Sequence, residues 1–142
     1  MTTPENQTRI LSVDDDPTIH LLLQIRVDGV GNIETLDSKD MDVRAAVEAI
    51  RAKLEDLDVL ILDGNYKGNE RTQDQSALEL IQALESELSS RGITVIVYSS
   101  GEEILRAVKN YYPSVATIAK PQNFDLIKEA VLARVPFQTN AA

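Results

Sequence analysis

Cysteine is absent from this 142-residue sequence, and histidine occurs once, as His20. Without cysteine the chain can form no disulfide, carries no catalytic thiol and offers no thiolate ligand for zinc. A single histidine likewise leaves little room for histidine-based metal chemistry. Any metal site in this chain therefore has to be built from oxygen ligands.

Positive charge is also scarce, with 14 Lys and Arg against 23 Asp and Glu and a net charge of -9. So acidic a surface repels phosphate backbones, and we expect no nucleic-acid partner. The longest strand-like apolar runs, Val59–Leu62 and Ile93–Tyr98, fall far short of the roughly 20 residues that a membrane helix needs. The start of the chain has neither the basic nor the apolar segment of a signal peptide. We therefore expect a cytoplasmic domain without membrane contact.

Short apolar runs alternate with helical patterns, which is typical of βαβ units around a parallel sheet. The predicted strands are Ile10–Val13, Ile33–Leu36, Val59–Leu62, Ile93–Tyr98 and Val115–Ala119. Gly92 and Pro113 are predicted to end the helices that precede the fourth and fifth of these strands. We expect one α/β domain over residues 9–135, flanked by flexible segments at 1–8 and 136–142.

Two helical details can be predicted from spacing and composition. Ile104, Val108 and Tyr111 recur at helical intervals and should form the buried face of the fourth helix. Asn123 is a candidate N-cap for the last helix.

Polar side chains follow four of the five predicted strands. They are Asp14, Asp15 and Asp16 after the first strand, Asp63 after the third, Ser99 after the fourth and Lys120 after the fifth. Each motif alone is ordinary turn or capping chemistry. In an open parallel sheet, however, ligands bind outside the carboxyl ends of the strands. Their joint placement therefore predicts one shared site.

Acidic groups that converge without histidine suit Mg²⁺, which takes one or two carboxylates, backbone oxygen and several waters. Lys120 would present a positive charge to an anion, and Ser99 would donate a hydrogen bond to the same anion. A cation site beside an anion site is the arrangement found in phosphoryl-transfer sites, where positioning and charge neutralisation account for most of the catalysis.

The sequence also resembles a known family, the receiver domains of two-component response regulators. The resemblance spans Arg9 to about Val135 and rests on four runs: Ile10–Pro17, Asp58–Asp63, Val95–Ser100 and Ala119–Pro121. In the family these runs correspond to the opening acidic motif, the phosphoacceptor strand, a strand that ends in a hydroxyl and a lysine–proline step. The resemblance implies a flavodoxin-like (βα)5 three-layer sandwich whose five-stranded parallel sheet has the order 2-1-3-4-5.

The resemblance assigns a role to each strand-end residue. Asp63 would accept a phosphoryl group from a phosphohistidine and form an acyl phosphate. Mg²⁺ would be ligated directly by Asp15, Asp63 and the backbone carbonyl of Asn65, and through water by Asp14. Ser99 and Lys120 would each bind a phosphoryl oxygen.

The implied phosphoryl donor is a sensor histidine kinase or a histidine phosphotransferase domain. The chain would act as a stand-alone receiver that catalyses its own phosphorylation and dephosphorylation without turning over an independent substrate. It would then contact an output protein through the face of the fourth helix, fifth strand and fifth helix, or relay the phosphoryl group onward.

Two positions depart from the family pattern. Lys67 stands where the family has a proline four residues after the acceptor, and Thr117 replaces the Tyr or Phe of the conformational switch. Because threonine has no ring to swing between pockets, Thr117 favours an alternative, a receiver-like binding module that signals without phosphorylation. The intact acidic set argues against that alternative, since clustered carboxylates are costly without a cation.

A phosphatase is the second alternative. Asp14–Thr18 fits the Asp-x-Asp-x-Thr motif of haloacid-dehalogenase-like phosphatases, with Asp14 and Asp16 as its acids. No strand followed by an acidic motif comes after Lys120, and Asp63 would have no role, so the receiver interpretation is preferred. His20, early in the first helix, is predicted to be a surface or boundary residue.

Overall fold

The computed structural model describes residues 8–14, 17–27, 29–37, 41–63, 76–99, 101–119 and 124–139. The strands are β1 (Thr8–Asp14), β2 (Gly31–Asp37), β3 (Val59–Asp63), β4 (Thr94–Ser99) and β5 (Ala116–Ala119). The α-helices are α1 (Pro17–Arg26), α2 (Val43–Arg51), α3 (Ser76–Arg91), α4 (Glu102–Tyr111) and α5 (Phe124–Ala133), and η2 (Leu54–Asp56) is a short 3₁₀ helix. Every predicted strand is present, with its ends shifted by at most two residues.

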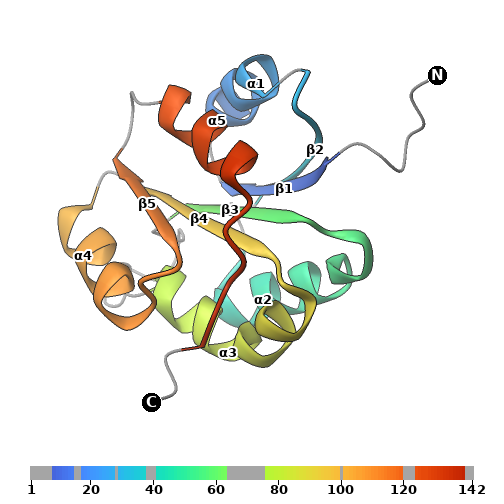
Figure 1. The fold of residues 1–142 in the computed structure, drawn as a ribbon. Helices are drawn as coiled ribbons and strands as arrows, with labels where there is room; N and C mark the ends of the chain where they lie inside the picture. Colours follow the sequence, from blue (N-terminus) through green and yellow to red (C-terminus); the bar gives the residue numbers. More distant parts are fainter. Residues whose placement is uncertain are drawn as a thin grey trace.

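The five strands form one parallel sheet in the order β2-β1-β3-β4-β5, which confirms the flavodoxin-like three-layer fold. Helices α1 and α5 cover one face of the sheet, and α2, α3 and α4 cover the other (Figure 1). Within the described residues, no helix has the length and apolar character to span a membrane.

The central strands are apolar throughout because both faces of the sheet are buried. Along β1, Ile10 packs with the α1 and α5 layer, and Leu11 packs with the layer of α2, α3 and α4. Each fully buried side chain of this size stabilises the fold by about 1.5–3 kcal/mol. The two apolar clusters therefore hold the central strands rigidly and fix where those strands end.

Two glycines lie at positions where a larger residue would clash or strain the backbone. A Cβ on Gly31, the first residue of β2, would lie 2.8 Å from the carbonyl oxygen of Thr8 on β1. Gly92 has a φ of +63° and ends α3, as predicted, because glycine adopts this left-handed conformation without steric cost.

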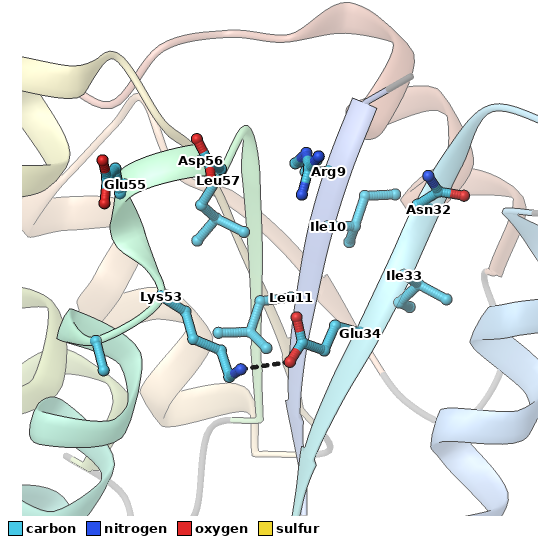
Figure 2. Close-up of a pocket in the computed structure, with 11 residues that line it drawn as sticks. Arg9, Ile10, Leu11, Asn32, Ile33, Glu34, Lys53, Glu55, Asp56 and Leu57 are labelled. Atoms are coloured by element: carbon cyan, nitrogen blue, oxygen red, sulfur yellow. Dashed lines mark hydrogen bonds and ion pairs between the residues drawn. The ribbon is translucent and has the colours of Figure 1, made fainter. Parts of the chain in front are cut away.

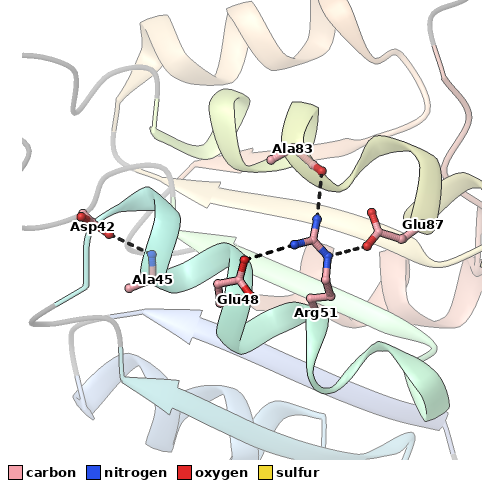
Figure 3. Close-up of polar contacts among 6 residues, drawn as sticks. All are labelled: Asp42, Ala45, Glu48, Arg51, Ala83 and Glu87. Atoms are coloured by element: carbon pink, nitrogen blue, oxygen red, sulfur yellow. Dashed lines mark hydrogen bonds and ion pairs between the residues drawn. The ribbon is translucent and has the colours of Figure 1, made fainter.

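Polar contacts join α2 to α3 on the outer surface (Figure 3). Asp42 caps α2 by accepting a hydrogen bond from the backbone nitrogen of Ala45 at 2.8 Å. Arg51, near the end of α2, donates to the Glu87 carboxylate of α3 at 2.6 Å. This hydrogen bond lowers the pKa of Glu87, but both side chains are partly solvated and the pair adds little to stability.

The buried face of α4 differs from its prediction at one position. Ile104 and Val108 are buried as expected, whereas Tyr111 is 50% exposed and Tyr112 is only 2% exposed. The expectation that Tyr111 is buried is therefore wrong. Tyr112 follows the last residue of α4 with a non-helical backbone, and this change of direction turns its ring into the core beside Phe137. The hydroxyl of Tyr112 donates to the Glu85 carboxylate of α3 at 2.7 Å.

The chain after α5 is packed against the fold. It crosses from the α5 layer toward α3 (Figure 1), and Phe137 is 2% exposed within the cluster of the opposite layer. The ring of Phe137 lies 5.2 Å from that of Tyr112, and its backbone nitrogen donates to the Ile93 carbonyl at 2.8 Å. The expectation of a flexible segment from residue 136 onward is therefore wrong for 136–139, and residues 140–142 lie outside the described part.

Burial and the negative charge of Glu85 raise the pKa of Tyr112 above the ordinary value for tyrosine. The unfolded chain then releases this proton at a lower pH than the folded protein does. The contribution of Tyr112 to stability is thus fully present below about pH 10 and is lost as the pH rises through its folded pKa. We expect Tyr112→Phe to flatten the alkaline fall in the free energy of unfolding, measured by urea denaturation from about pH 8 to about pH 11. An identical slope in wild type and variant would contradict this linkage.

Phe137→Ala should reduce the free energy of unfolding by about 3–5 kcal/mol, because it removes a buried ring and leaves a cavity beside Tyr112. Urea denaturation measures the change. Val135→Ala is the matched control in the same segment, since Val135 is 48% exposed and its truncation should cost under about 1 kcal/mol. Equal effects of the two substitutions would show that the segment is not docked in solution.

Candidate functional site

Three neighbouring strands end side by side, and their last residues are Asp14, Asp63 and Ser99. The register pairs Val13 with Leu62 and Asp63 with Tyr98, so the three ends are aligned to within one residue. Neighbouring strands lie about 4.8 Å apart, and the three backbones therefore span roughly 10 Å.

This edge is also the topological switch point of the sheet. From β1 the chain runs outward to β2, then returns to β3 on the other side of β1 and continues to β4 and β5. The helices that follow β1 and β3, α1 and α3, lie on opposite faces of the sheet (Figure 1), and ligands of open α/β sheets bind where the strand order reverses in this way. Asp14 and Asp63 are the last residues of the two strands that meet at this switch point.

Buried polar side chains gather toward the same edge. The described core buries five polar or charged side chains: Ser12, Asp14, His20, Thr94 and Ser99. Of these, only Thr94 lies at the start of a strand. Burying polar groups costs free energy unless they are paired, so their concentration at one end of an otherwise apolar sheet makes this edge the candidate site.

Asp14 is the most deeply placed of the described carboxylates, with 3% of its surface exposed. A charged carboxylate at this depth requires compensation by hydrogen bonds or positive charge. Its backbone carbonyl accepts a hydrogen bond from Nε2 of His20 at 3.0 Å. The end of β1 is thus attached to the first turns of α1 as well as to the sheet.

His20 is 9% exposed and belongs to the buried side chains of α1, so the prediction of a surface or boundary residue is wrong. Its Nδ1 lies 3.2 Å from the hydroxyl of Ser12, and its Nε2 contacts the Asp14 carbonyl. A carbonyl can only accept, so Nε2 carries the proton of this contact. The spacing to Leu23 and Val27 places residue 20 on the buried face of α1, a signal that could have revealed it from the sequence.

Ser99 is fully buried, and its hydroxyl oxygen accepts a hydrogen bond from the backbone nitrogen of Gly101 at 3.0 Å. Gly101 precedes the first residue of α4, so Ser99 orders the turn into that helix. The contact occupies a lone pair of the oxygen and does not use the hydroxyl hydrogen. Ser99 can therefore order this turn and still donate to an anion.

The described residues include only part of the predicted site. Asp15, Asp16, Asn65, Lys67, Lys120 and the candidate cap Asn123 lie outside the described residues, and Asp63 is placed by its backbone alone. Within the described part of the chain, no group of three or more acidic, histidine or cysteine side chains is positioned to hold a metal ion. Ala119, which precedes Lys120, lies opposite Ser99 on the adjacent strand.

The amino-terminal edge of the sheet has a different character. A cavity of about 320 Å³ there is lined by residues that include Arg9, Asn32, Glu34 and Lys53 (Figure 2). Lys53 forms an ion pair with Glu34 across this cavity. Lys53 and Glu34 are partly exposed, and the described residues that line this cavity include no buried polar side chain, so it is distinct from the predicted site.

Asp58, five residues before Asp63, is a structural clamp at that amino-terminal edge. Its carboxylate accepts a hydrogen bond from the backbone nitrogen of Arg9 at 2.8 Å and forms an ion pair with Arg134 at 3.3 Å. These contacts tie the start of β1 and the end of α5 to the start of β3. Asp58 therefore contributes to the stability of the fold, and it lies at the opposite end of β3 from Asp63.

No protein-family model and no curated protein matches this chain in sequence. Solved structures do match in fold. A two-component response regulator from Cytophaga hutchinsonii is 17% identical with a TM-score of 0.66, covering 90% of this chain and 96% of that one. A response regulator receiver domain from Clostridium thermocellum is 16% identical with a TM-score of 0.63, covering 90% and 94%.

Further receiver domains are among the neighbours, and so is a de novo designed Rossmann 2x3 protein. The designed protein is 21% identical with a TM-score of 0.56, covering 87% of this chain and 86% of that one. The chain thus has the fold of response regulator receiver domains, and the resemblance seen in the motifs is confirmed at the level of the fold. Since a designed protein shares the topology, the fold does not by itself define the chemistry.

Ser99→Ala should accelerate hydrogen exchange at the Gly101 amide and reduce the free energy of unfolding by about 0.5–1.5 kcal/mol. The reason is that the Gly101 nitrogen loses its acceptor at the start of α4. Exchange followed by NMR and urea denaturation provide the measurements. Ser90→Ala, which alters an exposed hydroxyl on α3, should change stability by under about 0.5 kcal/mol. Unaltered exchange at Gly101 in Ser99→Ala would refute the assigned contact.

Proposed function

We propose that this protein is a receiver that accepts a phosphoryl group on Asp63. In this reaction a carboxylate oxygen of Asp63 attacks phosphorus, the phosphorus–nitrogen bond of a phosphohistidine breaks, and the departing imidazole keeps the electron pair. The supporting observation is that buried Asp14 and buried Ser99 flank the end of β3 at the topological switch point. A receiver fold and the strand-end residues Asp63 and Lys120 in the sequence agree with this function.

Mg²⁺ is the cation that these residues would hold. The donor chemistry fits, because the side chains of Asp14, Asp15 and Asp63 and the backbone carbonyl of Asn65 offer only oxygen. The deep burial of Asp14 supports a cation there, since a buried carboxylate near other acids is stabilised by positive charge. When bound, Mg²⁺ would neutralise negative charge on the phosphoryl group.

Ser99 and Lys120 would bind the oxygens of the phosphoryl group. The Ser99 hydroxyl is held by Gly101, which orients it before the donor arrives and reduces the cost of ordering it. The amine of Lys120 would offset the repulsion between the acidic strand ends and an anionic donor. These roles require residues at or directly after the ends of three adjacent strands, β3, β4 and β5, to act together.

The partners of this reaction would be a histidine kinase or a histidine phosphotransferase domain, and an output protein. A groove of about 480 Å³ lies along β5, α5 and the end of α4 and is mostly apolar, with Thr117, Ile118 and Leu126 in its lining. Leu126 and Val135 both line it and are exposed. This groove supports the face of α4, β5 and α5 as the surface that contacts the output protein.

Thr117 favours a second candidate function, a binding module that works without phosphorylation. Its small side chain lines the groove at the position where the family carries a switch aromatic, so no ring has to move before a partner binds. A permanently open groove would bind its partner equally well with and without phosphorylation. Partner affinity before and after phosphorylation therefore separates the two functions.

Intact-protein mass spectrometry after incubation with acetyl phosphate tests the proposed chemistry. We expect one phosphoryl adduct on the wild type in the presence of Mg²⁺, and a loss of at least tenfold in its yield when EDTA removes the metal. Asp63→Asn should abolish the adduct, because an amide oxygen is a poor nucleophile toward phosphorus. Asp56→Asn is the matched control, since Asp56 is an exposed carboxylate at the opposite edge of the sheet.

The outcomes are distinct. No adduct on a folded wild-type protein would reject phosphorylation and favour the binding module. An adduct that persists in Asp63→Asn but disappears in Asp14→Asn would instead favour the phosphatase that uses Asp14 and Asp16.

A further inference from the structure

A hydrogen bond joins the end of β1 to the first turn of α1. Only two residues separate Asp14 from Pro17, the first residue of α1, and His20 is the fourth residue of that helix. From there its ring returns to the end of β1, where Nε2 donates to the Asp14 carbonyl at 3.0 Å. This hydrogen bond therefore joins the end of β1 directly to the first turn of α1.

Both ring nitrogens of His20 are engaged. Because the Asp14 carbonyl only accepts, Nε2 carries a hydrogen, and in the neutral ring Nδ1 accepts from the Ser12 hydroxyl at 3.2 Å. Ser12 is itself buried within β1. A rotation of the ring by half a turn would remove both contacts, so Ser12 holds the orientation in which Nε2 meets Asp14.

The surroundings make this contact hard to replace by water. His20 shares the buried face of α1 with Ile19 and Leu23, and these side chains belong to the apolar cluster between α1, α5 and the sheet. In such surroundings a hydrogen bond is electrostatically stronger than in water, and a lost partner leaves the carbonyl unsatisfied. The Asp14 carbonyl is therefore held firmly by His20.

The direction of that carbonyl matters for the acidic site. The carbonyl is part of the planar peptide unit that links Asp14 to the next residue of the acidic motif. The orientation of the carbonyl therefore fixes the orientation of that peptide plane. Residues that orient metal ligands in this way often change metal affinity by an order of magnitude although they never touch the metal.

We infer that His20 is a positioning residue, which holds the backbone of Asp14 in the orientation that binds Mg²⁺ at the end of β1. The inference rests on the proposed function for the identity of the cation. His20 needs no phosphoryl group and makes no contact with one in this role. It acts through the Asp14 carbonyl, and Ser12 acts through the His20 ring.

The test compares three folded variants by NMR during titration with Mg²⁺ alone. His20→Leu fills much of the same space without a donor, and we expect it to weaken the dissociation constant on the order of tenfold. His20→Gln places an amide N–H near the former Nε2 and should restore binding to within about threefold of wild type. Gln24→Leu, the same apolar replacement on the exposed face of α1, should leave binding unchanged.

A second readout does not depend on the metal. The carbonyl ¹³C resonance of Asp14 should shift in His20→Leu and stay near its wild-type position in His20→Gln, since only the first variant loses the donor. Urea denaturation of both variants separates positioning from general destabilisation. If His20→Leu does not fold, Ser12→Ala replaces it, with an expected loss of about threefold in Mg²⁺ affinity and a smaller shift of the same resonance.

Equal Mg²⁺ affinity in wild type and His20→Leu would overturn this inference and leave the proposed function intact. Equal weakening in His20→Leu and His20→Gln, in proportion to their loss of stability, would also overturn it, because the role would then be structural. A folded wild-type protein that binds no Mg²⁺ would overturn the inference and the magnesium-dependent function together.

Discussion

The pairing of β1 with β3 is the constraint on which the candidate site depends. These strands lie at the centre of the sheet, and their ladder runs from Ile10 opposite Val59 to Val13 opposite Leu62. A shift of one residue in this register would turn every side chain of a strand to the other face and expose the buried clusters. The apolar packing on both faces therefore determines that Asp14 and Asp63 end their strands together at the switch point.

The two edges of the sheet are built differently. At the amino-terminal edge, Asp58 joins the starts of β1 and β3 to Arg134. The backbone nitrogen of Phe137 donates to the carbonyl of Ile93, the residue before β4. These contacts stabilise the fold. At the carboxyl edge, the buried polar groups Asp14, His20 and Ser99 replace apolar packing, which costs stability unless their partners are present. The contacts at the amino-terminal edge make the sheet rigid, and this rigidity allows the carboxyl edge to hold buried polar groups.

The elements that could be predicted are those whose signal is local. Apolar runs such as Val59–Leu62 indicated the central strands, and Gly92 indicated the end of α3, because burial on both faces and left-handed backbone each select particular residues. Strand-end positions likewise singled out Asp14 and Ser99. By contrast, Tyr111 and Tyr112 are adjacent residues of the same type, and only the direction of the chain after α4 decides which ring is buried.

The sequence by itself determined the class of fold and the strand ends where chemistry is to be sought, since hydrophobic periodicity and strand-end polarity are properties of short segments. Only the tertiary structure decided that Phe137 belongs to the core and that His20 holds the Asp14 carbonyl. Both results depend on contacts between residues of different elements, which the hydrophobic pattern of a single segment does not predict. Phe137 reaches Ile93 and Tyr112 after the chain has crossed between layers, and His20 reaches β1 only because α1 packs back over it.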